Sequence, residues 1–140
     1  MKLRIEEATV QLRLTRAEIA ELAAQGRLEV ATPLGAGQIL RYRLEAAEVP
    51  AIAVAWADGV LTVRLPRAAA AEWASSGRIG FAHEIDAGGK PLTVRVEWDF
   101  KGEQQPERKA RRQEAMEEAY TGSERDGRED RLAERDEPSD

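Results

Sequence analysis

The chain has 140 residues and no cysteine, so disulfide scaffolds, thiolate catalysis and cysteine-based zinc sites are excluded. Its 21 basic and 26 acidic residues give a formal net charge of −5. The chain therefore lacks the net positive charge typical of nucleic-acid binders. No apolar run approaches the ~20 residues of a membrane span and no secretory signal opens the chain, so we expect a cytoplasmic protein with no membrane partner.

The first half of the chain alternates strand and helix signals. Lys2–Glu6 and Val10–Leu14 switch between polar and apolar residues, the period of a half-buried strand. Thr15 and Glu18 form a capping box, and Gly26 is placed to end the helix that follows. The predicted helix has an apolar stripe of Ile19, Leu22 and Ala23. A Gly35-Ala36-Gly37 turn then separates a third strand from a fourth strand that contains Leu40–Glu45.

The second half gives the same order. Ala51–Ala57 and Val60–Leu65 flank Asp58-Gly59, a strong hairpin signal. Pro66 is suited to the first turn of a helix, and Gly77 is predicted to end it. Its apolar stripe is Ala70, Trp73 and Ala74. Alternation of Leu92, Val94, Val96 and Trp98 with polar residues predicts the last strand, and we expect Trp56, Trp73 and Trp98 in the core.

The two halves resemble each other in sequence. Val10–Val30 recurs as Leu61–Phe81 at an offset of 51, and Leu40–Glu45 recurs as Leu92–Glu97 at an offset of 52. We therefore predict an α+β fold of two tandem ββαββ repeats, residues 1–50 and 51–101, related by a pseudo-two-fold. They would form one antiparallel sheet or a partly closed eight-stranded barrel covered by two short helices.

The pattern stops near Lys101. Residues 102–121 have high helix propensity but few side chains that could pack, so a helix there is an open alternative. Residues 122–140 are nearly all charged residues, Gly, Ser and Pro. Such a segment cannot bury enough apolar surface to offset its ordering entropy, which predicts a disordered tail.

Arginines on the polar strand faces are the candidate ligand-binding residues, namely Arg13, Arg43, Arg64 and Arg95. If the strands closed into a barrel with this face inward, the guanidinium groups would favour phosphate in the lumen, as in triphosphate-tunnel enzymes. The alternative, which we favour, is a solvated face on which Arg and Glu pair across strands. His83 is the only histidine, is expected on a polar face, and cannot build a His-metal cluster alone. We predict no catalytic residue, metal ligand or cofactor.

Two resemblances add to this reading. Leu12–Glu29, Leu40–Glu45, Leu61–Ala74 and Arg95–Lys101 resemble, in this order, a small uncharacterised bacterial family over residues 1–101, which implies no activity. The segment from Val63 through Glu97 is more weakly similar to swapped-hairpin (AbrB-like) modules of bacterial regulators and antitoxins. That resemblance implies a DNA-binding surface formed by two copies, here supplied by one chain, although the Leu-Gly-Leu-x-x-Gly-Asp step of those modules is missing.

The favoured hypothesis is a non-catalytic binding or adaptor module whose partner is an unknown protein or a small anionic ligand. The motivation is that no constellation of nucleophile, base and stabiliser is visible. The alternatives are a nucleic-acid-binding regulator of swapped-hairpin type and a triphosphate-tunnel-like phosphohydrolase. Whether the chain forms a homodimer stays open.

Overall fold

The computed structural model describes residues 1–104. The chain divides into two units, Met1–Phe100 and Lys101–Asp140, and the first holds the architecture described below. The elements of the described residues, in chain order, are β1 (Lys2–Glu6), β2 (Thr9–Leu14), α1 (Arg16–Gln25), β3 (Arg27–Gly35), β4 (Gln38–Ala47), β5 (Ala53–Ala57), β6 (Val60–Pro66), α2 (Arg67–Ser75), β7 (Gly80–Asp86), β8 (Pro91–Trp98) and α3 (Phe100–Gln104). The rest of the helix predicted over 102–121 and the predicted tail 122–140 lie outside the described residues.

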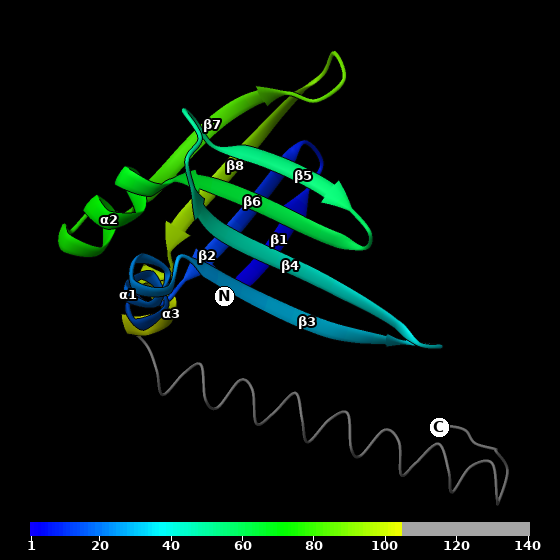
Figure 1. Ribbon diagram of the computed structural model, residues 1–140, viewed down its shortest axis with the longest axis horizontal. Helices are drawn as coiled ribbons and strands as arrows, with labels where there is room; N and C mark the ends of the chain where they lie inside the picture. The colour runs from blue at the N-terminus through cyan, green and yellow to red at the C-terminus, as the bar shows by residue number, and fades with distance from the viewer. Residues whose placement is uncertain (105–140) are drawn as a thin grey trace, which may run out of the picture. The chain divides into compact units, whose positions relative to one another are not determined.

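The strands form two four-stranded sheets (Figure 1). Sheet A has the order β1-β2-β8-β7, and sheet B has the order β3-β4-β6-β5. The outer pairs of each sheet are antiparallel hairpins, whereas the two central strands, β2 with β8 and β4 with β6, run parallel. The fold is therefore α+β, but the prediction of one antiparallel sheet or a partly closed barrel is wrong. Two separate sheets with parallel centres replace it.

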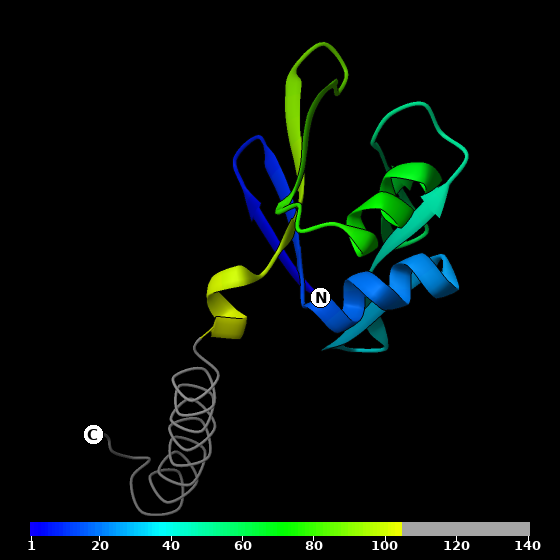
Figure 2. The ribbon, with the colours of Figure 1, turned by 90° about the vertical axis from the view of Figure 1, so that its left-hand side faces the viewer.

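Each sheet draws one hairpin from the first half of the chain and one from the second. The β1–β2 hairpin pairs with β7–β8, and the β3–β4 hairpin pairs with β5–β6. The central registers correspond: Val10 is opposite Val94 in sheet A, and Leu61 is opposite Tyr42 in sheet B. The chain crosses between the sheets through α1 and returns through α2, so the helices join the two layers (Figures 1 and 2).

The two helices differ in how they begin and end. At α1 the Thr15 hydroxyl accepts a hydrogen bond from the Glu18 amide at 3.2 Å, and Glu18 accepts one from the Thr15 amide at 2.9 Å. Gly26 ends α1 in the left-handed conformation with φ of 82°, so the predicted capping box and terminator are confirmed. Helix α2 follows Pro66 with no side-chain cap and ends at Ser75, where Ser76 is extended. The prediction that Gly77 ends this helix is wrong.

One core lies between the inner faces of the sheets and the two helices. It includes Ile19 and Leu22 of α1 and Ala70 and Trp73 of α2, all buried as predicted. Trp73 is fully buried, and its indole N–H donates to the Arg78 carbonyl at 3.0 Å. The burial of this polar atom is thus satisfied by a backbone partner. Ala23 and Ala74, also placed in the stripes, are exposed, so each stripe is narrower than predicted.

The prediction that all three tryptophans lie in the core is wrong for Trp56, whose surface is 63% exposed. Trp56 lies on the inner face of β5. Because β5 is an edge strand, no further strand lies beside Trp56 on the side away from β6. Ile5 holds the corresponding position on β1, the edge of sheet A, and is 62% exposed. Trp56 shares the face of Val54, and its position on an edge strand leaves it exposed.

The start of the chain links both sheets to α1. The Met1 ammonium pairs with the Glu18 carboxylate, and the Tyr42 hydroxyl of β4 donates to the Met1 carbonyl at 2.8 Å. Partial burial acts to raise the pKa of Glu18, but hydrogen bonds from the Met1 ammonium and from Thr15 outweigh it, so that pKa lies below its ordinary value of 4.5. Burial, and then the nearby Glu18 charge, raise the pKa of Tyr42. This cluster fixes the first strand of sheet A against sheet B.

Candidate anion-binding face

The four candidate arginines separate into two pairs. Arg13 on β2 and Arg95 on β8 lie on the outer face of sheet A, and Arg43 on β4 and Arg64 on β6 lie on the outer face of sheet B. The inner faces of both sheets contribute to one core, so the two outer faces are directed away from it. The sheets do not close, so the lumen on which all four guanidinium groups would have converged does not form.

Sheet B carries the denser cluster of arginines. We call it the arginine face, and it consists of Arg27, Glu29, Arg41, Arg43, Glu45 and Arg64. These residues share a face because their positions on β3, β4 and β6 alternate with inward-facing positions, of which Leu28, Leu44 and Val63 form one buried row. Burial of that inward row therefore holds the arginines on the solvent side.

Glu29 is shared by three arginines. Its carboxylate accepts from Arg43 Nε at 2.8 Å, from Arg27 Nη2 at 3.3 Å and from Arg41 Nη1 at 3.4 Å. The hydrogen bond from Arg43 is the main reason that the pKa of Glu29 lies below its ordinary value, and the charges of the three arginines add to it. One carboxylate thus neutralises a single charge among three guanidinium groups.

Glu45 connects the remaining pair. Its Oε1 lies 3.2 Å from Arg64 Nε, and its Oε2 lies 3.6 Å from Arg43 Nη1. Across the outer face of sheet B four arginines meet two glutamates, which leaves an excess of two positive charges. The neighbouring outer positions on β5 are Ala53, Ala55 and Ala57, whose small side chains do not cover this face. The surface suits a ligand that carries carboxylate or phosphate groups.

The outer face of sheet A has the opposite balance. Asp99 contacts Lys2 at 2.8 Å and Arg13 at 3.9 Å, and Glu97 accepts a hydrogen bond from the side-chain Nε2 of Gln11 at 2.6 Å. Its outward basic residues are Lys2, Arg4, Arg13 and Arg95, and its outward acidic residues are Glu6, Glu84, Asp86, Glu97 and Asp99. The buried Nε of Arg13 has no hydrogen-bond partner. The difference in charge between the two outer faces therefore favours anions on sheet B rather than on sheet A.

The sequence analysis selected Arg43 and Arg64, which both lie on this face, but it did not select Arg27, Glu29 or Arg41. A usable signal existed, because Arg27, Glu29 and Ala31 alternate with Leu28 and Val30 as in a half-buried strand. What alternation could not show is that β3 lies beside β4 in a register that sets Glu29 opposite Arg43.

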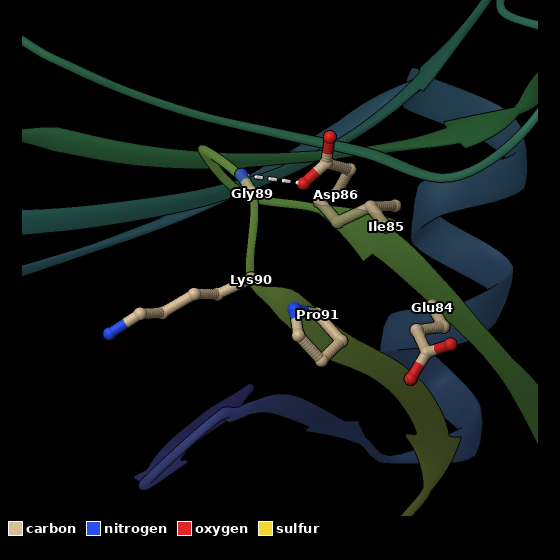
Figure 3. A pocket seen from close by; sticks show the side chains of 6 residues that line it. All are labelled: Glu84, Ile85, Asp86, Gly89, Lys90 and Pro91. Carbon is tan, nitrogen blue, oxygen red and sulfur yellow. Dashed lines mark hydrogen bonds between the residues drawn. The ribbon is translucent and has the colours of Figure 1, made fainter.

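Two other features carry no comparable chemistry. His83 lies opposite Val94, on the inward-facing phase of β7, so its predicted place on a polar face is wrong, although it is exposed. A shallow depression of about 310 Å³ lies at the β7–β8 turn and is lined by Glu84, Ile85, Asp86, Gly89, Lys90 and Pro91 (Figure 3). There Asp86 accepts a hydrogen bond from the Gly89 amide at 2.7 Å, which stabilises the turn itself.

Within residues 1–104, no group of three or more His, Cys, Asp or Glu side chains gathers as a metal site would require. Over the same part of the chain, no helix combines the length and the apolar character needed to cross a membrane.

Comparisons with known proteins identify a family but no activity. No curated protein and no solved structure matches the chain. A family model described as a family of unknown function, DUF7009, matches residues 1–117, which extends beyond the resemblance seen over residues 1–101. The chain therefore belongs to the family of unknown function DUF7009.

Proposed function

We propose that this chain is a non-catalytic binding module that docks an anionic partner on the arginine face of sheet B. The observation that carries the proposal is the excess of arginine over glutamate on one ordered face, with Glu29 shared among three guanidinium groups. Guanidinium groups bind carboxylate and phosphate through two parallel hydrogen bonds. A ligand with several such groups matches this surface.

The internal ion pairs do not prevent ligand binding. Arg27, Arg41 and Arg64 retain 55%, 40% and 39% of their side-chain exposure, and exposed pairs of this kind contribute only ~0.2–1 kcal/mol each. An incoming anion can therefore replace Glu29 at Arg27 and Arg41, or Glu45 at Arg64, at small cost. Arg43, at 24% exposure and between both glutamates, is held in place before the ligand arrives.

Binding rather than turnover follows from the same chemistry. Arginine stays protonated at all relevant pH values, so it supplies no general base. Glu29 has a lowered pKa and accepts hydrogen bonds from three arginines, which makes it a poor proton acceptor near neutral pH. The face can hold an anion but lacks a group poised to transfer protons.

The test compares two double variants of the whole chain. Arg43→Gln with Arg64→Gln removes two guanidinium groups from sheet B, and Arg13→Gln with Arg95→Gln is the matched control on sheet A. The probes are a fluorescent poly-glutamate peptide and inorganic tripolyphosphate, measured at low salt by anisotropy and by calorimetry. We expect affinity to fall at least about tenfold in the sheet B variant and to stay within about twofold in the control.

Three results would contradict the proposal. The first is that neither probe binds the wild-type chain. The second is that both double variants lose affinity equally, and the third is that the chain hydrolyses tripolyphosphate. The last result would also reopen the phosphohydrolase hypothesis, now without the enclosed lumen on which it was based.

A second candidate function is nucleic-acid binding by an internally duplicated swapped-hairpin module. We infer that residues 1–50 and 51–101 are tandem repeats, since residues related by offsets of 51 and 52 hold matching registers. Val10 opposite Val94 corresponds to Leu61 opposite Tyr42. The exchange of hairpins between the halves favours this hypothesis, because one chain then forms what swapped-hairpin modules build from two.

If the chain binds nucleic acid, its affinity should fall steeply as salt rises, more steeply than its affinity for an acidic peptide. A labelled DNA duplex should shift at low salt and release as salt rises, and replacing Arg43 should reduce the slope by about one phosphate contact. The absence of any shift at low salt would eliminate this candidate and leave the first proposal intact.

A further inference from the structure

Strand β5 is an edge strand without the usual protection. Exposed edges normally carry charged residues, proline or a bulge that prevents pairing with another strand. Of the four edge strands in the described part of the chain, β1, β3 and β7 carry charged residues, and β3 also contains Pro33. The sequence of β5 is AVAWA, with no charge and no proline over Ala53–Ala57. Its chemistry permits strand addition.

The backbone of β5 is also oriented for pairing. Asp58 and Gly59 have φ of 54° and 75°, the positive values of a type I′ two-residue turn, which makes Ala57 and Val60 a hydrogen-bonded pair. Hydrogen-bonded pairs alternate along an antiparallel ladder, so Ala55 and Thr62 form the next one. The amide and carbonyl groups of Val54 and Trp56 are therefore directed away from β6. No strand of residues 1–104 lies on that side.

We propose that β5 pairs antiparallel with β5 of a second copy of this chain, about a two-fold axis at Ala55. Only this register pairs all five residues. It sets Val54 opposite Trp56 of the second copy, so these two residues exchange both backbone hydrogen bonds, and the symmetric pair does the same. Sheet B becomes one eight-stranded sheet across the dimer.

The side chains favour a second copy over an unrelated strand. On the inner phase an aromatic residue packs against a β-branched one twice, and the exposed Trp56 becomes covered. On the outer phase alanine meets alanine, so the symmetry axis brings no like charges together. The same operation on β1 would place Arg4 directly opposite Arg4 of the second copy, which is unfavourable.

The dimer goes beyond the proposed function and does not depend on it. The arginine faces of both copies would lie on one continuous sheet, with the alanine rows of β5 between them. A ligand long enough to reach both faces would gain from bivalent binding. Failure of anion binding would nevertheless leave the pairing of β5 untouched, because the two are measured separately.

The experiment measures the mass of the full chain by sedimentation velocity over a dilution series. Ala55→Glu places two carboxylates opposite each other at the axis, and Ala82→Glu is the matched control, because Ala82 occupies the outer face of the edge strand β7. We expect a wild-type dimer, at least a tenfold weaker dimer for Ala55→Glu, and no change for Ala82→Glu. Circular dichroism confirms that each variant is folded.

A mixture of two oppositely charged variants gives the most specific test of the proposed dimer. Ala55→Lys alone should also weaken the dimer, but an equimolar mixture with Ala55→Glu should restore it, since opposite charges then meet at the axis. Fluorescence of Trp56, referenced to a Trp56→Phe variant, should shift to shorter wavelength as the dimer forms. A wild-type chain that stays monomeric, an Ala55→Glu variant that dimerises normally, or a mixture that stays monomeric would each overturn the proposal.

Discussion

Strands β1 and β5 hold the same place in the two sheets, yet they present different edges. Each forms the edge beside the central strand that leads into a helix, β2 before α1 and β6 before α2. Their inner residues match in character, with Leu3 and Val54 against the core and Ile5 and Trp56 largely exposed. Their outer residues do not match: β1 carries Lys2, Arg4 and Glu6 where β5 carries three alanines.

The difference shows which positions the fold restricts. Inner residues must fill one shared core, so both sheets keep large apolar side chains there. Outer residues, apart from the buried Thr62 and Asp99, are at least partly exposed to solvent and are free to differ. Sheet A uses them for balanced ion pairs and a charged edge, whereas sheet B combines an arginine-rich centre with an uncharged edge. The two interaction surfaces proposed above therefore both belong to sheet B.

The largest expected effect tests the equivalence of the inner faces. Leu14 ends β2 and Leu65 lies at the end of β6, and both are fully buried. Leu14→Ala and Leu65→Ala should each lower the free energy of unfolding by about 2–5 kcal/mol, because each leaves a cavity in the same core. Urea unfolding measures both. A difference above about 2 kcal/mol between them would show that the two sheets do not contribute equally.

A smaller effect on stability is expected at the first turns of α1 and α2, which differ in capping. Thr15→Ala removes the capping hydroxyl of α1 and should reduce the free energy of unfolding by about 1 kcal/mol. Helix α2 has no side-chain cap, so hydrogen exchange in its first turn should be faster than in the first turn of α1. Equal exchange rates at the two helix starts would contradict the importance of this cap.

Acid should weaken the junction at Met1. Because the pKa of Glu18 is lowered in the folded state, its contribution to stability is present above about pH 4.5 and is lost as pH falls through the lower folded value. Glu18→Gln should flatten this part of the pH profile by a few tenths to about 1 kcal/mol, since the pair is partly exposed. Glu21→Gln, an exposed position on the same helix, serves as the control. A residue added before Met1 should remove the part of this effect that comes from the ammonium group and leave the hydrogen bonds from Thr15 in place.

The smallest effect on stability is expected when two charges of β1 are removed, which makes this edge strand resemble β5. Arg4→Ala with Glu6→Ala removes one exposed ion pair, which should change the free energy of unfolding by less than about 1 kcal/mol. It also removes charge from the edge of sheet A, so species larger than a dimer should appear at high concentration in sedimentation runs. A mass distribution identical to that of the wild type would show that the charges of β1 are not what keeps that edge unpaired.

Local elements were predictable because their signals are local. Thr15 and Glu18 lie three residues apart, and Asp58-Gly59 specifies its own turn, so the sequence predicted this helix start and this hairpin. Strand pairing was not predictable in the same way. Alternation is the same whether a strand pairs parallel or antiparallel, so nothing in Thr9–Leu14 indicated that it would lie parallel to β8.

For the candidate site too, the sequence revealed local features but not the pairing of strands. Arg43 and Arg64 were recognised from alternation, and the register then placed Glu45 between them. Arg13 and Arg95 were recognised by the same signal but belong to sheet A, which only the pairing of hairpins determines. The exposure of Trp56 depends on a missing neighbour at the edge of a sheet, which no pattern within β5 reveals.

The exchange of hairpins also bears on how the chain acquires its structure during synthesis. The centre of sheet A joins Leu14 to Trp98, so a ribosome must release nearly the whole first unit before β2 finds its parallel neighbour. Contacts this distant in sequence slow folding. Until then the emerging β1–β2 hairpin presents an unsatisfied apolar face, and sheet B, complete once β6 has emerged, is expected to assemble first.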